Sequence, residues 1–174
     1  MVDPHRFGLA HSRITVSTVG VVEKIKRLVA DAPKVRLALS LHAPTQELRR
    51  QIVPSARTFH IDELMEAIDL KTSVTGVNVL IEYVLLHGVN DSEEVAHQVG
   101  KLLKGKNVKV NLIPFNPVYG INFTAPPREA VETFSQVLQQ YGLYTLTRRE
   151  MGSDPIKPPS NFPRPPHARM HERH

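Results

Sequence analysis

Four apolar segments of this chain each end in polar residues, and a segment with helical spacing follows each of them. The polar ends are Ser17-Thr18, Ser40-Leu41-His42, His87-Gly88-Val89-Asn90-Asp91 and Pro114-Phe115-Asn116-Pro117. Repeated strand–helix units require parallel pairing of the strands with right-handed crossover connections. The carboxyl ends of parallel strands lie at one edge of the sheet, so these polar residues are expected to converge there. The pattern predicts a ligand site at that edge.

The order of the predicted elements is β-α-β-α-α-β-α-β-α-β. Strands are predicted at 13–17, 35–41, 77–86, 108–113 and 144–147, where β-branched or apolar residues gather. Helices are predicted at 21–30, 45–49, 61–70, from Asp91 or Ser92 to about 103, and at 128–141. Such a chain forms either an open doubly wound sheet or an arc of a barrel. No G-x-G-x-x-G sequence is present, which leaves a dinucleotide-binding fold with little support.

Composition narrows the class of protein. The chain has 174 residues, enough for one domain with its own core, and 41% of them are hydrophobic. No apolar run approaches the roughly 20 residues of a membrane span, and the first residues do not resemble a signal peptide. The expected location is therefore the cytoplasm, with a plastid or another organelle as the alternative. The sequence contains no cysteine, which excludes disulfides, thiol nucleophiles and iron–sulfur ligation by this chain.

The last twenty residues differ from the rest. Residues 155–174 contain six prolines, and their four basic and one acidic side chains carry +3 of the net charge of +5. A segment of this composition cannot bury a core and is predicted to be disordered. Its three histidines give only a weak metal-binding pattern, so no metal ligand is predicted. The predicted layout is a lead-in at 1–12, one domain at 13–154 and a Pro/Arg/His-rich tail at 155–174.

Neutral polar side chains dominate the predicted edge. They belong to Ser17, Ser40, His42, His87, Asn90 and Asn116. Such groups donate and accept hydrogen bonds, and they suit the ribose hydroxyls, carboxylates and amino groups of a small ligand. For Ser17, Asn90 and Asp91, a role in capping a helix or fixing a turn is an equally good interpretation. A binding role is favoured for Ser40 and His42, because histidine is not a typical turn residue.

Two further features allow two interpretations each. Glu82 lies inside an apolar strand, where a carboxylate needs either an aqueous site or a partner such as Arg36. Tyr119 and Phe123, in the long predicted loop 114–127, are able either to stack on a base or to anchor the loop. The sequence contains no Ser-His-Asp order, HExxH motif or phosphate-binding loop.

Four blocks of the sequence closely resemble consecutive blocks of the RlmN/Cfr family. They are RITVSTVG at 13–20, LSLHAP at 39–44, IEYVLL at 81–86 with VND at 89–91, and NLIPFNP at 111–117. The resemblance extends from about Gly8 to Asp154. Members are radical S-adenosylmethionine (SAM) enzymes that methylate adenosine in RNA, and RlmN enzymes act at C2 of an adenine in ribosomal RNA and in certain transfer RNAs. The resemblance implies an α/β fold of about five parallel strands with helices outside, a partial (β/α) barrel of the radical SAM type.

The resemblance also implies the site and its cofactors. Ser17, Ser40, Leu41, His42 and Asn116 match family positions that contact SAM. In the family, a [4Fe–4S] cluster cleaves SAM to a 5′-deoxyadenosyl radical, and a cysteine near the C-terminus carries the methyl group. The implied partners are ribosomal and transfer RNA, and no membrane is implied.

This sequence departs from the family pattern in its catalytic residues. The cluster motif C-x-x-x-C-x-x-C, a Gly-Glu contact to SAM and the general-base glutamate all lie upstream of the matched blocks and have no counterpart here. Arg148, Gly152 and Asp154 match the family, but Pro159 stands where the methyl-carrying cysteine belongs. No catalytic residue and no cluster ligand is therefore predicted, and the chain alone is expected to be inactive.

Three explanations of this pattern remain open. The first is that the chain is a portion of an RNA methyltransferase, for example a truncated isoform or an incomplete gene model. The remaining strands of the barrel would then come from the missing N-terminal half or from another chain. Alternatively, it is a non-catalytic fragment that binds SAM or RNA. A lyase or aldolase without a cluster ranks last, because no strand end carries a lysine that could form a Schiff base.

Overall fold

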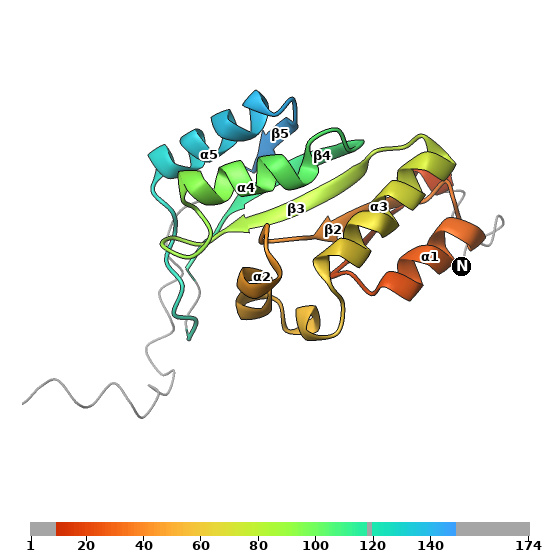
Figure 1. Ribbon diagram of the computed structural model, residues 1–174, viewed down its shortest axis with the longest axis horizontal. Helices are drawn as coiled ribbons and strands as arrows, with labels where there is room; N and C mark the ends of the chain where they lie inside the picture. The colour runs from red at the N-terminus through yellow and green to blue at the C-terminus, as the bar shows by residue number, and fades with distance from the viewer. Residues whose placement is uncertain (1–9, 118–119, 149–174) are drawn as a thin grey trace, which may run out of the picture.

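The computed structural model describes residues 10–117 and 120–148, which form a five-stranded parallel sheet with helices (Figure 1). The strands are β1 (Thr15–Thr18), β2 (Arg36–Ser40), β3 (Val79–Leu85), β4 (Val108–Pro114) and β5 (Tyr144–Thr147). They pair in the order β1-β2-β3-β4-β5, each parallel to its neighbour. All five carboxyl ends therefore lie at one edge, as the sequence predicts. β1 and β5 are the outermost strands of this sheet, and the outer edge of each is unpaired among the described residues.

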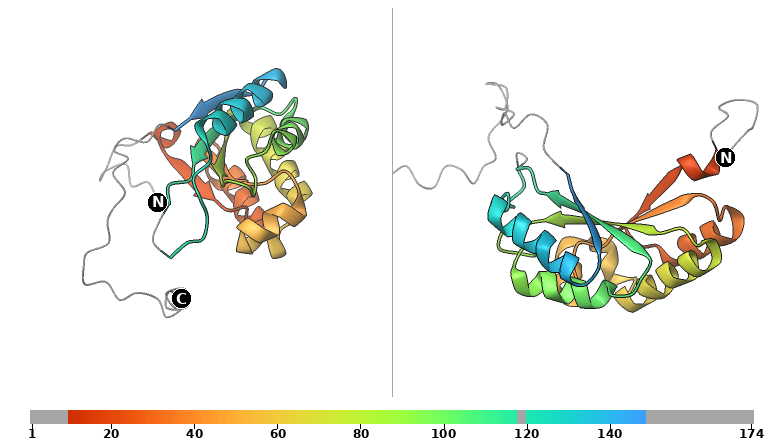
Figure 2. Two further views of the ribbon diagram at one scale, coloured as in Figure 1. Left: turned by 90° about the vertical axis from the view of Figure 1, so that its left-hand side faces the viewer. Right: turned by 90° about the horizontal axis from the view of Figure 1, so that it is seen from above.

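The helices lie along one face of the sheet. They are α1 (Val22–Asp31), α2 (Gln46–Ile52), α3 (Ile61–Thr75), α4 (Glu93–Leu103) and α5 (Arg128–Gln140), with short 3₁₀ turns at His11–Arg13 and Pro54–Arg57. Figure 2 shows α1, α3, α4 and α5 in an arc beneath the strands, while the opposite face, here called the open face, carries no helix of the described chain. No helix in these residues is long and apolar enough to cross a membrane. One-sided coverage of this kind leaves the open face free to line a site.

The core lies between the sheet and the helices. Alternate residues of β3, beginning with Val79 and ending with Leu85, are fully buried, whereas Leu80, Glu82 and Val84 are only half-buried. The near-continuous apolar run of this strand predicts burial on both faces. The structure corrects this prediction, because the open face of β3 is only partly covered.

The helix boundaries follow local capping. Thr45 Oγ1 accepts a hydrogen bond from Leu48 N at 3.3 Å, and Ser92 Oγ accepts one from Val95 N at 3.3 Å. Ser92, and not Asp91, is therefore the N-cap of α4. Helix α3 extends to Thr75, beyond the predicted 61–70, and ends at Gly76 with a φ of 68°.

Several predictions concern residues outside the described ranges. They are the lead-in up to residue 9, Tyr119, the family positions Gly152 and Asp154, Pro159, and the tail 155–174.

Candidate functional site

The ends of β1 and β2 place two serines on the open face. Ser17 pairs with Ala38 in the parallel register, and Ala38 lies two residues before Ser40. Side chains two residues apart in a strand share a face, and so do residues paired across neighbouring strands. Ser17 and Ser40 therefore lie on the same face, with Ser40 nearer the carboxyl edge. Ser17 is exposed, because β1 is the outermost strand on its side of the described sheet.

A polar row crosses the open face next to this edge. Ser40 pairs with Glu82 of β3, and Glu82 pairs with Asn111 of β4. Asn111 Nδ2 donates a hydrogen bond to Glu82 Oε2 at 2.8 Å. The partner of Glu82 is therefore a neutral amide, and the alternative that it pairs with Arg36 is wrong. The row combines a hydroxyl, a carboxylate and an amide on three adjacent strands.

His42 is held in an uncommon backbone conformation. Its φ is 60°, and among the described residues it is the only one other than glycine with a positive φ. Its Nδ1 accepts a hydrogen bond from Val84 N at 3.1 Å, and its carbonyl oxygen accepts one from Asn90 Nδ2 at 2.9 Å. An Nδ1 that accepts cannot carry the proton, so in the neutral ring Nε2 carries it.

The surroundings of His42 keep this ring neutral. Burial and, to a smaller extent, the nearby Arg49 charge lower the pKa of His42 from 6.5 to about 4. The ring is therefore uncharged at neutral pH. Its remaining polar group, Nε2–H, is a hydrogen-bond donor and has no partner within residues 10–117 and 120–148. Chemically, His42 is suited to bind a ligand acceptor and unsuited to supply protons at neutral pH.

Both backbone polar groups of Leu41 have a hydrogen-bond partner within the fold. Its side chain is fully buried, its N–H donates to Glu82 O at 3.1 Å, and its carbonyl accepts from Arg49 Nε at 3.1 Å. These bonds fix the backbone between Ser40 and His42, and a contact of Leu41 with SAM stays a prediction.

Asn90 has a structural role. It is fully buried, its Oδ1 accepts from Leu86 N at 2.7 Å, and its Nδ2 donates to Val84 O at 2.7 Å and to His42 O at 2.9 Å. These bonds occupy its side chain and fix the end of β3. Asp91 and His87 lie in the same turn.

The Asp91 carboxylate is also satisfied by its own turn. Oδ1 accepts from Gly88 N at 2.8 Å, and Oδ2 lies 3.0 Å from His87 Nδ1. Of the two interpretations left open for Asn90 and Asp91, the structure supports the turn-fixing one.

Asn116 follows β4 and is exposed at the same edge. The preceding residue, Phe115, donates its N–H to Leu85 O at 3.0 Å, and its ring meets that of Phe123 edge-on with 6.1 Å between centroids. Phe123 thus anchors the described part of the loop, which is one of its two predicted roles. The Asn116 amide has no hydrogen-bond partner in the described part of the chain.

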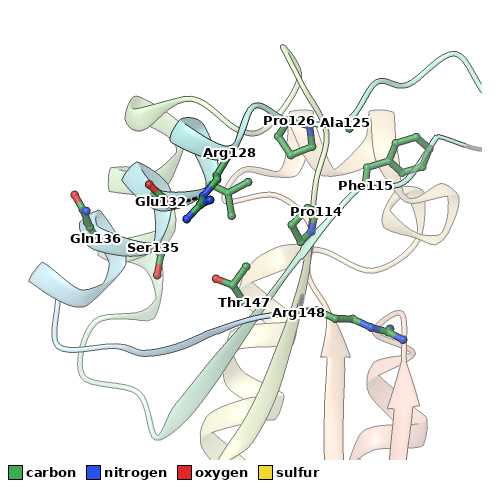
Figure 3. A pocket seen from close by; sticks show the side chains of 11 residues that line it. Pro114, Phe115, Ala125, Pro126, Arg128, Glu132, Ser135, Gln136, Thr147 and Arg148 are labelled. Atoms are coloured by element: carbon green, nitrogen blue, oxygen red, sulfur yellow. Dashed lines mark hydrogen bonds and ion pairs between the residues drawn. The ribbon is translucent and has the colours of Figure 1, made fainter. Parts of the chain in front are cut away.

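A cavity of about 950 Å³ lies beyond β4 (Figure 3). Its lining residues are Pro114, Phe115, Ala125, Pro126, Arg128, Val131, Glu132, Ser135, Gln136, Thr147 and Arg148. Arg128 Nε and Glu132 Oε1 form an ion pair across 2.7 Å at its α5 wall. None of the five residues predicted to contact SAM lines this cavity. The helical spacing within 128–141 could have placed Arg128, Glu132 and Ser135 on neighbouring turns, but nothing in the sequence predicts that this surface faces a cavity.

Comparison with known proteins defines the class first. No family model matches the chain. A solved radical SAM methyltransferase from Sphaerobacter thermophilus is similar with a TM-score of 0.80 and 41% identity, over 83% of this chain and 42% of that one. A domain of pyruvate-formate lyase-activating enzyme from Bacteroides vulgatus shares the fold with a TM-score of 0.60 at 17% identity, over 78% of this chain and 80% of that domain. The fold is that of a partial radical SAM barrel.

The sequence is similar to a more particular group. A probable dual-specificity RNA methyltransferase RlmN from Caldicellulosiruptor saccharolyticus is 48% identical over 140 residues, which cover 80% of this chain and 41% of that protein. The chain is thus similar to one portion of these RlmN proteins, and it spans about two fifths of the length of the curated relatives it matches. This agrees with the family resemblance of the four sequence blocks.

Proposed function

We propose that this chain is the SAM-binding portion of a radical SAM methyltransferase that modifies RNA at C2 of adenosine in ribosomal and transfer RNA. The proposal includes a cytoplasmic location, or a plastid or other organelle as the alternative. Its support is the similarity to RlmN proteins together with the chemistry of the edge formed by Ser17, Ser40, His42 and Asn116.

One observation carries the proposal. The side chains at this edge form two groups: some have hydrogen-bond partners within the described residues, and the others have none. Asn90 and Asp91 are bonded to neighbouring backbone. Ser17, Ser40, the Nε2 of His42 and Asn116 have no such partner among the described residues. Donors and acceptors without internal partners are available to a polar ligand.

The donor set fits SAM. Ser40 and Asn116 offer both donors and acceptors, and His42 offers one fixed donor, which together suit the amino, carboxylate, hydroxyl and adenine groups of this ligand. When bound, SAM supplies the methyl group and the adenosyl carbon. The residues of this chain would hold the adenosyl and methionyl parts of SAM in one orientation. They would thereby limit which atoms the reactive carbon can contact.

The iron–sulfur cluster does not fit this chain. Cluster iron is held by cysteine thiolates, and the sequence has none. Within the described residues, no group of three or more His, Asp or Glu side chains is arranged to hold a metal ion either. In the proposed enzyme the cluster would therefore be held by cysteines outside this sequence, in another portion of the enzyme or in another chain.

Titration of the full chain with SAM tests the binding proposal. Replacing Ser40 by alanine should weaken SAM binding about fivefold, because one hydrogen bond to a polar ligand contributes about 1 kcal/mol. Isothermal titration calorimetry measures this effect. The matched control is Ser73→Ala. Ser73 is an exposed serine in the last turn of α3, at the opposite end of the sheet, so this variant should bind SAM with the affinity of the wild type. Absence of SAM binding by the wild-type chain would refute the proposal.

Methyl transfer by the chain alone is expected to be absent. After anaerobic reconstitution with iron and sulfide, the purified chain should retain no cluster iron and should not methylate a ribosomal RNA fragment. Pro159→Cys should not restore activity, since a carrier cysteine has no function without the cluster. Iron analysis and mass spectrometry of the RNA provide the measurements. SAM binding without transfer also fits the alternative of a non-catalytic binding fragment, which the lack of cysteine favours.

A further inference from the structure

Strand β2 has a buried cation at each end. At its start, Lys71 Nζ donates to Pro33 O at 2.6 Å and to Val35 O at 2.9 Å. At its end, Arg49 lies against the turn that follows the strand. The exposed fraction is 1% for Lys71 and 0% for Arg49. The two residues therefore provide the same kind of backbone contact at opposite ends of one strand.

Arg49 joins the ends of two strands. Its Nη2 donates to Val19 O, after β1, at 2.7 Å, and to Ser40 O, at the end of β2, at 3.2 Å. Its Nε donates to Leu41 O at 3.1 Å. Three carbonyl groups that continue no strand ladder are thus satisfied by one planar guanidinium group, which lysine could not do with the same geometry.

Arg49 has no acidic partner among the described residues. A buried charge without a counter-ion is unfavourable unless several hydrogen bonds satisfy it. Its Nη1 is buried and has no hydrogen-bond partner in this part of the chain. The hydrogen bonds to three backbone carbonyls are therefore what stabilise this charge, and two of them fix the backbone immediately before His42.

We propose that Arg49 is a positioning residue of the ligand edge, which holds the β1 and β2 ends together and fixes His42 as a neutral Nε2–H donor for an acceptor atom of SAM. The inference rests on the proposed function only for the identity of the ligand. The Arg49 bonds to the Ser40 and Leu41 carbonyls set the chain direction into His42. Val84 N and Asn90 Nδ2 then fix the ring and the carbonyl of His42 from the β3 side.

The other charged groups near this site are engaged elsewhere. The carboxylate of Glu82 accepts from Asn111, and that of Asp91 accepts from Gly88 and lies against His87. The Arg49 charge lies beside the His42 ring and opposes its protonation. Removal of this charge should therefore make the ring easier to protonate.

Three variants of the full chain test the role of Arg49. Arg49→Met removes the donors and the charge, Arg49→Lys keeps the charge but not the planar donor set, and Lys71→Met removes the matched cation at the other end of β2. Nitrogen-15 NMR of the His42 ring reports its tautomer and its pKa, and calorimetry reports the affinity for SAM. Circular dichroism identifies a temperature at which each variant is folded.

The expected results separate positioning from general stability. Arg49→Met should weaken SAM binding at least tenfold, raise the pKa of His42 above its wild-type value and mix the ring tautomers. Arg49→Lys should weaken binding less and keep the pKa of His42 close to that of the wild type. Lys71→Met should lower the melting temperature but leave the ring tautomer unchanged and the affinity within twofold.

Two outcomes would overturn the inference. One is a folded Arg49→Met chain whose SAM affinity, His42 tautomer and His42 pKa all equal those of the wild type. If the methionine variant does not fold, the same result in a folded Arg49→Lys chain is the overturning outcome. The other is an equal change in Lys71→Met, which would show that any loss of stability has this effect. If the wild-type chain does not bind SAM, the proposed function fails, while the NMR titration still decides whether Arg49 fixes the ring.

Discussion

Replacing Asn90 by alanine should lower the free energy of unfolding by about 3 kcal/mol and the melting temperature by about 10 °C. The side chain is fully buried and bonds to three backbone groups, those of Leu86, Val84 and His42. Alanine would leave all three without a partner, and buried unsatisfied backbone groups are more costly than the net gain from a hydrogen bond. Urea unfolding followed by circular dichroism measures the change.

The control for this prediction is Asn107→Ala. Asn107 Nδ2 also donates to a carbonyl, that of Gly76 at 3.2 Å, but the bond is exposed and water replaces it. The expected loss is below about 0.5 kcal/mol. A similar loss of unfolding free energy in the two variants would show that the buried bonds of Asn90 stabilise the fold no more than the exposed bond of Asn107.

The alternation of strands and helices was sufficient to predict the edge where the polar residues gather. Five apolar stretches separated by amphipathic segments allow only parallel pairing, and parallel pairing alone brings the ends of β1 to β5 to one side. Local signals were equally reliable where one residue decides the geometry, as with Thr45 at the start of α2. Each strand, helix or cap in these predictions is recognised from its own residues, without knowledge of distant contacts.

The roles of individual edge residues could not be predicted in this way. Asn90 and Asn116 are the same residue type after neighbouring strands, yet one is saturated and buried while the other is exposed. The difference depends on partners distant in sequence, since Asn90 bonds to His42 across 48 positions. Arg49 bonds to Val19 across 30 positions, and in the sequence it reads as an ordinary charged residue of a short helix.

Contacts between residues distant in sequence hold the chain after β2 against β3. The β2–β3 ladder ends with the pairing of Ser40 and Glu82, and beyond it Leu41 N still donates to Glu82 O. The His42 ring then accepts the Val84 N–H in place of a strand carbonyl. The sheet is thus extended by a side chain after the backbone has turned away. This arrangement couples the protonation state of one ring to the integrity of the edge.

Acidification should therefore destabilise the chain through His42. The pKa of this ring is lowered to about 4 in the folded state from 6.5 in the unfolded state, so the unfolded state binds more protons between these values. The stability that the neutral ring contributes is complete above pH 6.5 and is lost as the pH falls through 4. The expected loss is about 2 kcal/mol by pH 5 and about 3 kcal/mol by pH 4.

The variant His42→Asn isolates this contribution from the carboxylates that also titrate. Asparagine tolerates a φ near 60° and does not titrate, so its own stability change with pH reports every group except His42. The difference in unfolding free energy between wild type and variant, measured by urea unfolding at pH 7 and pH 5, should shift by about 2 kcal/mol against the wild type at the lower pH. A difference that stays constant would mean that the ring is protonated with its ordinary pKa, and that the Val84 N–H does not hold it neutral.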